Sequence, residues 1–145
     1  MWIGEFSHSL DEKNRCVLPS KFRGLVKEKK VDRFFITRGF EGCIAMYEEC
    51  EWNKLVEKLS ALNTAKPEVR AVHRLLFGSA TEVVPDAQGR FVLPDSLREY
   101  AGVTGKDIVI LGVSNRIEIW SKDHWTKQYE QNRENLEKMA ENLVF

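Results

Sequence analysis

The stretch "SLDEKNRCVLPSKF", residues 9–22, recurs in altered form as "VPDAQGRFVLPDSL", residues 84–97. Both copies contain the pattern Asp-x-x-x-Arg-x-Val-Leu-Pro. The charged residues that they share are two matched pairs, Asp11 with Arg15 and Asp86 with Arg90. The repetition raises the question of whether these charges serve the architecture of the protein or its function.

The similarity between the copies extends beyond these stretches. "CIAMYEECEW", residues 43–52, matches "RIEIWSKDHW", residues 116–125. Two copies are too few for a solenoid, which generally needs three or more. We therefore predict two related units that complete one another around a pseudo-twofold axis as one intertwined domain. Its expected parts are a first repeat with its trailing helix (1–65), a connecting helix (66–79) and a second repeat with a C-terminal helix (80–145).

Composition and cysteine usage indicate a soluble protein of the reducing cytoplasm. Of the 145 residues, 43% are hydrophobic and 30% charged, which is typical of a globular fold. No apolar run approaches the roughly 18 residues that span a bilayer, and the N-terminal segment is charged where a signal peptide is apolar. Cys16, Cys43 and Cys50 lack the spacing of a disulfide framework or zinc site. We expect no metal, cofactor, membrane partner or small-molecule substrate.

Charge is segregated along the chain, although the net charge is zero. Residues 13–33 contain eight cations and two acids, whereas residues 41–57 contain five glutamates and one lysine. A neutral chain with such a basic segment can present a positive face to phosphate groups. A charge run is also typical of an ordinary solvated surface, so nucleic-acid binding is one of two interpretations at this point.

Each copy predicts the same order of strands and helices, and hence an α+β fold. A short strand closed by proline is followed by two strands about a tight turn, because proline cannot continue a ladder. The alternation of Ile117 and Ile119 with Glu118 and Trp120 predicts a strand with one face on the core. The expected strand segments are residues 15–19, 34–40, 43–47, 90–94, 107–113 and 116–120.

The helices are predicted from apolar spacing and from their end signals. Residues 67–77 have proline in the first turn and Gly78 at the end. A short helix after the second Val-Leu-Pro should use Asp95 or Ser96 as its N-cap and stop at Gly102.

Ser121 should cap a final helix that runs through residues 122–143. Its apolar side chains form an approximate stripe with two interpretations: a helix packed on its own domain, or a seam for a neighbouring subunit. The residues of this stripe are Tyr129, Leu136, Met139 and Leu143.

The doubled turn predicts how its charges are arranged. Its fourth residue is Asn14 in one copy and Gly89 in the other, the two residue types that most readily adopt a positive φ. Both copies therefore predict the same tight hairpin turn. The aspartate should accept hydrogen bonds from turn amides or pair with the arginine, which would hold the guanidinium in one direction.

The Asp–Arg pair has a plain and a functional interpretation. The plain one is an ion pair that closes a surface hairpin. The functional one is a nucleic-acid contact, since arginine suits bidentate recognition of phosphate or of guanine O6 and N7. The polar and basic neighbours favour the second: Lys13, Lys21 and Arg23 around the first turn, Gln88 and Arg98 around the second.

We do not expect an enzyme. His8, His73 and His124 are far apart and in no metal-binding spacing, and no phosphate loop, nucleophile elbow or dinucleotide motif occurs. An arginine four residues from each aspartate keeps the carboxylate ionised, which makes it a poor general acid. Cys16 precedes an apolar Val-Leu pair and is interpreted as a core residue.

Three adjacent stretches carry a resemblance to a known family. "VVPDAQGRFVLPDSLREYAGV", preceded by "HRLLFGSATE" and followed by "VILGVSNRIEIWSKDHW", closely resembles the MraZ family of bacterial transcriptional regulators. That family belongs with the AbrB-like, swapped-hairpin DNA-binding proteins. The resemblance covers the chain from Ile3 to about Tyr129, and the doubled Asp-x-x-x-Arg is specific to it.

The resemblance implies a fold and an assembly. The two repeats would interlock into a pseudo-symmetric, swapped-hairpin β-barrel flanked by helices. Protomers would form a closed ring, commonly an octamer, that binds direct repeats in double-stranded promoter DNA. Such proteins are nucleoid-associated and generally repress their own division and cell-wall operon.

The resemblance also implies roles for the turn residues. Arg15 and Arg90 would be the principal DNA contacts, and Asp11 and Asp86 would orient them. The remaining turn positions of the expected DNA-binding site are Lys13, Asn14, Gln88 and Gly89. The family usually has glycine before the arginine; asparagine tolerates the same backbone, but the base preference of the first turn is open. The alternative function is a ring-forming scaffold whose turns bind a protein.

Overall fold

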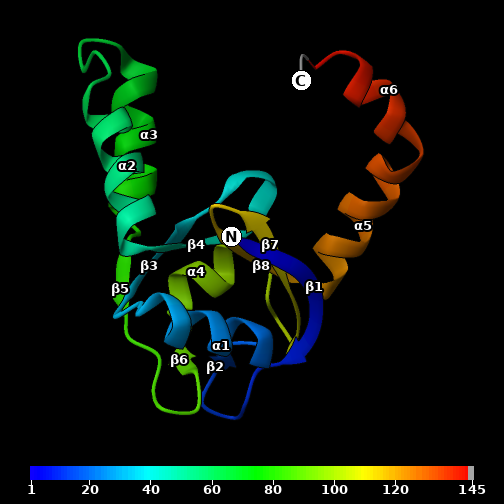
Figure 1. The fold of residues 1–145 in the computed structure, drawn as a ribbon. Helices are drawn as coiled ribbons and strands as arrows, with labels where there is room; N and C mark the ends of the chain where they lie inside the picture. The colour runs from blue at the N-terminus through cyan, green and yellow to red at the C-terminus, as the bar shows by residue number, and fades with distance from the viewer. Residues whose placement is uncertain (144–145) are drawn as a thin grey trace.

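The computed structural model of the protein describes residues 1–143, in which short strands and helices alternate (Figure 1). The final two positions of the predicted 80–145 segment lie outside the described residues. The elements are β1 (Trp2–Ser9), β2 (Arg15–Val17), α1 (Ser20–Lys29), β3 (Phe34–Arg38), η1 (Phe40–Gly42), β4 (Ile44–Glu48), α2 (Glu49–Ser60), α3 (Pro67–Phe77), β5 (Thr81–Val83), β6 (Arg90–Val92), α4 (Asp95–Tyr100), β7 (Asp107–Ser114), β8 (Ile117–Ser121), α5 (Lys122–Asn132), η2 (Arg133–Asn135) and α6 (Leu136–Glu141).

The strands form a six-stranded antiparallel sheet in the order β1-β7-β8-β4-β3-β5 and a separate two-stranded ladder, β2-β6. Most ladders join strands from different copies: β1 with β7, β3 with β5, β4 with β8, and β2 with β6. Exchange of the two copies converts the β1–β7 pairing into the β5–β3 pairing and leaves the other two unchanged. Neither copy therefore completes its sheet without the other, and the α+β class is confirmed.

The ladders do not close into the expected barrel anywhere within residues 1–143. The large sheet ends at β1 and β5, and β2 and β6 pair only with each other. Both of these strands have three residues and are followed within two positions by Pro19 or Pro94. Because proline has no N–H and fixes φ, it stops the ladder before it reaches the large sheet.

The main apolar core lies between the large sheet and helices α1 and α4. Trp2 packs edge-on against Phe22 of α1, with 5.3 Å between ring centroids, and also contacts Phe34 of β3 at 5.8 Å. Leu97 of α4, the counterpart of Phe22, is likewise fully buried. Cys16 is buried in the same cluster, as predicted, and burial raises the pKa of its thiol to about 12.

The predicted ends of α3 and the predicted cap of α5 are confirmed, whereas the predicted N-cap of α4 is wrong. Helix α3 begins at Pro67 and ends at Phe77, and the Ser121 hydroxyl accepts a 3.1 Å hydrogen bond from the His124 amide as the cap of α5. In α4, however, Pro94 occupies the N-cap position and no side chain caps the helix. Proline has a fixed φ that suits entry into a helix, and Asp95 lies within the first turn, where it pairs with Arg98.

The predicted long final helix is interrupted. Helix α5 ends at Asn132, a 3₁₀ turn follows, and α6 continues from Leu136. The Asn132 side chain donates a hydrogen bond to the carbonyl of Gln128 at 2.9 Å, a local contact that competes with regular helix. The four apolar residues of this stripe are exposed, although the ring of Tyr129 packs against Trp125 with 6.1 Å between centroids.

Strand β8 is covered on both faces, contrary to the prediction of one core face. Ile117 and Ile119 are fully buried on one side, and Trp120 is also buried on the other. Trp120 packs against Trp125 of α5, with 5.6 Å between centroids, in a second apolar cluster that includes Cys43.

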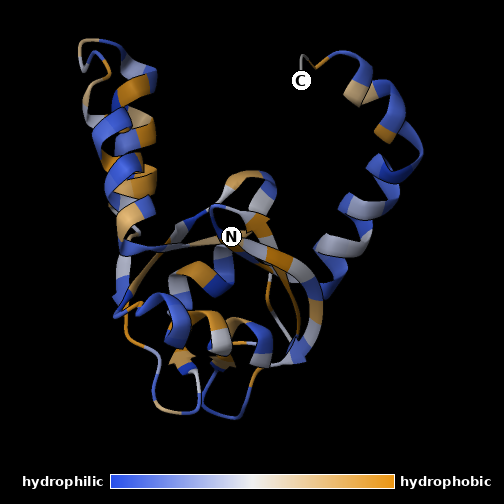
Figure 2. Cartoon of the chain, viewed as in Figure 1, coloured by the Kyte–Doolittle hydropathy of each residue, from blue (hydrophilic) through white to orange (hydrophobic). Residues whose placement is uncertain are grey.

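The molecule has two distinct ends. The two Asp-x-x-x-Arg turns project together from one end, whereas α2 with α3 and α5 with α6 extend from the other as two separate arms (Figure 1). Hydrophilic residues predominate in both turns, whereas hydrophobic residues are frequent in the strands (Figure 2). None of the helices described is long and apolar enough to cross a membrane, and residues 1–143 contain no metal-binding cluster of His, Cys, Asp or Glu.

Candidate nucleic-acid interface

The first turn is organised by the carboxylate of Asp11. Its Oδ1 accepts hydrogen bonds from the backbone amides of Lys13 and Arg15, both at 2.9 Å. Its Oδ2 accepts a 2.6 Å bond from Nε of Arg15. Asn14 has a φ of 57°, as predicted, and its amide donates to the Asp11 carbonyl at 3.0 Å. One side chain therefore fixes both the backbone of the turn and the direction of the guanidinium.

The second turn repeats these contacts. The carboxylate of Asp86 accepts from the amides of Gln88 and Arg90 at 2.9 Å and from Nε of Arg90 at 2.8 Å. Gly89 has a φ of 80°, and its amide donates to the Asp86 carbonyl at 2.8 Å. The hydrogen bonds predicted for both aspartates are thus present in the structure.

Each turn is also bonded to the strand that leaves the other. The amide of Leu18 donates to the carbonyl of Gly89 at 2.9 Å, and the amide of Leu93 donates to that of Asn14 at 3.1 Å. These reciprocal bonds close the β2–β6 ladder at both ends. The two turns therefore lie side by side as a single unit with matched geometry (Figure 1).

The ladder directs both arginines to its outer face. Cys16 lies opposite Phe91 in the register, and both side chains are buried in the core. Because side chains alternate along a strand, Arg15 and Arg90 face away from the core. Their side chains are 27% and 35% exposed.

The guanidinium groups retain unused hydrogen-bonding capacity. Nε of each arginine is bonded to aspartate, whereas Nη1 and Nη2 have no hydrogen-bond partner among residues 1–143. A planar guanidinium fork suits bidentate binding of a phosphate or of a guanine base edge. Because the carboxylate already restrains each side chain, less conformational entropy is lost on binding.

The same contacts keep the aspartates ionised. The hydrogen bond from the backbone amide of Arg15 is the main cause that lowers the pKa of Asp11 below its ordinary value. The amide and then the side chain of Arg90 lower the pKa of Asp86 in the same way. Ionised carboxylates are poor proton donors, so the paired turns offer charge and hydrogen bonds rather than acid–base chemistry.

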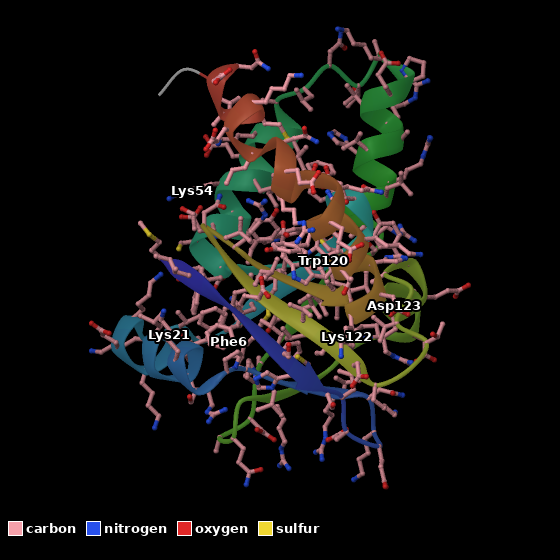
Figure 3. The ribbon with its side chains drawn as sticks, turned by 90° about the vertical axis from the view of Figure 1, so that its right-hand side faces the viewer. Phe6, Lys21, Lys54, Trp120, Lys122 and Asp123 are labelled. Carbon is pink, nitrogen blue, oxygen red and sulfur yellow. The ribbon has the colours of Figure 1, made fainter. Side chains whose placement is uncertain are left out.

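Basic residues of helix α1 lie beside the second turn, although in the sequence they follow the first turn. Arg23 donates from Nη1 to the Leu18 carbonyl at 2.6 Å, and its stem lies over Gly89 of the second turn. Lys27 lines a shallow pocket of about 210 Å³ beside the same turn. Lys21 is exposed on α1 near the turn end, whereas Lys54 of α2 lies toward the arms (Figure 3).

Sequence reasoning missed one cation at the first turn. Nζ of Lys106 donates to Oδ1 of Asn14 at 2.8 Å and to the carbonyl of Asp11 at 3.2 Å. Lys106 is 92 residues from Asn14, and only the pairing of β1 with β7 brings them together. Arg98, in contrast, is held by Asp95 and by the Leu93 carbonyl.

Fold and site together define a duplicated α+β protein in which two copies share their strands and expose a matched pair of Asp–Arg turns. The family model described as "MraZ protein, putative antitoxin-like" matches the chain twice, over residues 1–75 and 76–144. The chain belongs to the MraZ family, whose members are regulators rather than enzymes.

Two relatives illustrate the extent of this similarity. A protein of Desulforamulus reducens is 42% identical over 144 residues, which cover 99% of this chain and 98% of the relative. A protein of Syntrophomonas wolfei is 44% identical over 144 residues, which cover 99% and 97%. Both are named transcriptional regulator MraZ.

Proposed function

We propose that this protein is a sequence-specific DNA-binding transcriptional regulator whose paired turns contact the duplex. The observation that carries the proposal is the matched geometry of Arg15 and Arg90, each anchored through Nε with its outer nitrogens free among the described contacts. Lys13 and Gln88 extend the contact at the turn tips. The names of the relatives support the regulatory role.

We propose further that the protein acts as a closed homo-oligomeric ring, of which the octamer is the size implied by the family resemblance. One protomer offers two arginines and would hold DNA weakly. A ring multiplies identical turns, so DNA with regularly spaced repeats engages several of them at once. The exposed apolar residues of both arms support self-association; they include Leu62, Val72, Leu75, Tyr129, Leu136 and Met139.

The proposed target is a set of direct repeats in the promoter of the protein's own division and cell-wall operon, which it would repress at the nucleoid. This part of the proposal rests on the family resemblance. The same resemblance supports a description of the shared ladders as two swapped hairpins in one intertwined domain with the parts 1–65, 66–79 and 80–145.

The test is DNA binding by the double variant Arg15→Ala with Arg90→Ala. Loss of both guanidinium groups should lower the affinity for the upstream DNA at least tenfold, since each good contact contributes about 1–3 kcal/mol. Gel-shift titration measures affinity, and light scattering checks that the assembly is unchanged. Unaltered affinity in the double variant would contradict the proposed contact.

A protein-binding scaffold is the second candidate function, because the exposed arms offer apolar surface to a partner. Salt dependence separates the two. Affinity for DNA should fall steeply as ionic strength rises, because bound phosphates release counterions, whereas an apolar protein interface should respond little. A probe with a single repeat should also bind much more weakly than a probe with three.

A further inference from the structure

The position before the arginine is asparagine in the first turn and glycine in the second, and the surroundings of the two residues differ as well. In the first turn, Oδ1 of Asn14 accepts the 2.8 Å hydrogen bond from Nζ of Lys106, which also bonds the Asp11 carbonyl. A lysine ammonium only donates, so the amide oxygen of Asn14 must face it. The NH₂ group of Asn14 is consequently directed away from Lys106 and has no hydrogen-bond partner among residues 1–143.

The second turn has the opposite charge at the matching place. Phe34 and Ile108 are counterparts, because each pairs with the strand that opens the other copy. Two residues earlier, Lys106 therefore corresponds to Asp32. Asp32 lines the shallow pocket beside Gly89. The second turn therefore has an acidic residue, Asp32, at the position where the first turn has Lys106.

In the second turn, a side chain at this position would displace the stem of Arg23. A Cβ added to Gly89 would lie 2.7 Å from Cδ of Arg23, closer than such atoms approach one another. At the first turn the counterpart of Arg23 is Arg98, which is paired with Asp95. The difference between Asn14 and Gly89 is therefore built into the surroundings of each turn.

We propose that Asn14 is a specificity-determining residue of the first turn and that Lys106 is its positioning residue. The inference rests on the proposed DNA-binding function. With its oxygen engaged by Lys106, the Asn14 amide offers donors only, so it cannot make the bidentate adenine contact that needs both a donor and an acceptor. Donors match the O6 and N7 acceptors of guanine. The two turns of one protomer therefore prefer different bases, and the site that they read has a direction.

The experiment compares base preferences of the full-length protein and its variants on a randomised duplex library, sequenced before and after selection. Asn14→Gly gives the first turn the residue of the second, and glycine accepts the same φ. Lys106→Met removes the ammonium but keeps a similar stem, and Lys106→Arg restores a donor. Lys27→Met, beside the second turn, is the control for loss of one cation.

Asn14→Gly and Lys106→Met should each lose the guanine preference at one position of the site and weaken binding to the selected duplex about tenfold. Lys106→Arg should keep the preference, and Lys27→Met should weaken all sequences alike. An unchanged preference in Asn14→Gly would overturn the inference, and so would a uniform loss in Lys106→Met, which would make Lys106 a phosphate contact. If the unaltered protein selects no duplex, the proposed function fails instead.

Discussion

The two copies are nearly identical at the turn end of the molecule and clearly different at the arm end. Both turns use the same aspartate, the same amides and the same arginine nitrogen, at distances that agree within 0.2 Å. At the other end, α2 is backed by α3, whereas α5 bends through a 3₁₀ turn into α6.

This difference follows from how each end is stabilised. The turns are closed by their own hydrogen bonds and by the reciprocal bonds between them, so a change in one copy disturbs the other. The aromatic partners of the two arms, in contrast, differ in number and in burial. Trp52 of α2 stacks on Phe35 at 5.3 Å and meets Phe77 of α3 edge-on, whereas its counterpart Trp125 contacts Trp120 and a partly exposed tyrosine.

The largest expected effect tests this contrast between the arms. Trp52→Ala should lower the free energy of unfolding by about 3–5 kcal/mol, because Trp52 is only 8% exposed and the substitution removes its contacts with three aromatic rings. Trp125→Ala should cost about half as much, since Trp125 is only partly buried. Urea unfolding monitored by circular dichroism measures both.

The control for the arms is Tyr129→Ala, whose side chain is about half exposed and should change stability by less than about 0.5 kcal/mol. Equal losses in Trp52→Ala and Trp125→Ala would contradict the contrast. That result would show that the second arm is buried against another protomer in solution.

An intermediate effect on stability should distinguish the two turns at the position before the arginine. Gly89→Asn should destabilise the protein by about 1 kcal/mol, because its Cβ displaces the stem of Arg23. Asn14→Gly should cost less than this, since it removes the hydrogen bond to the exposed Lys106 but introduces no steric overlap. Thermal or urea unfolding of both variants measures the difference.

A double-mutant cycle with Arg23→Ala shows whether the cause is correctly assigned. When the arginine stem is absent, Gly89→Asn should become nearly neutral, because asparagine tolerates a positive φ. A penalty that persists in the Arg23→Ala background would mean that the backbone of the second turn, and not Arg23, rejects the side chain.

The turns were largely predictable from the sequence because their contacts are local. The acceptor, the donors and the residue with positive φ all lie within five consecutive positions, where Asp, Asn and Gly have strong conformational preferences. The α+β class and helix α3 were predictable for a similar reason, since apolar spacing and end signals are local features as well.

Contacts between the copies were not predictable in this way. Lys106 reaches Asn14, and Arg23 covers Gly89, only because strands of one copy pair with strands of the other. The open sheet and the break after Asn132 depend on where short strands end and how one amide bonds locally. No spacing within the sequence carries this information.

The smallest expected effect concerns the ionised aspartate that each turn contains. Because hydrogen bonds lower the pKa of Asp11 and Asp86 in the folded protein, ionisation of these carboxylates stabilises the native state. This contribution is complete above the pKa of the unfolded chain, about 3.9, and is lost as the pH falls through the lower native pKa. The double variant Asp11→Asn with Asp86→Asn should therefore be slightly less stable than the unaltered protein between pH 5 and 8, and the gap should close below about pH 4. Urea midpoints across this pH range measure the gap. A gap that stayed constant to low pH would show that the carboxylates act through shape and hydrogen bonding alone, with no contribution from their charge.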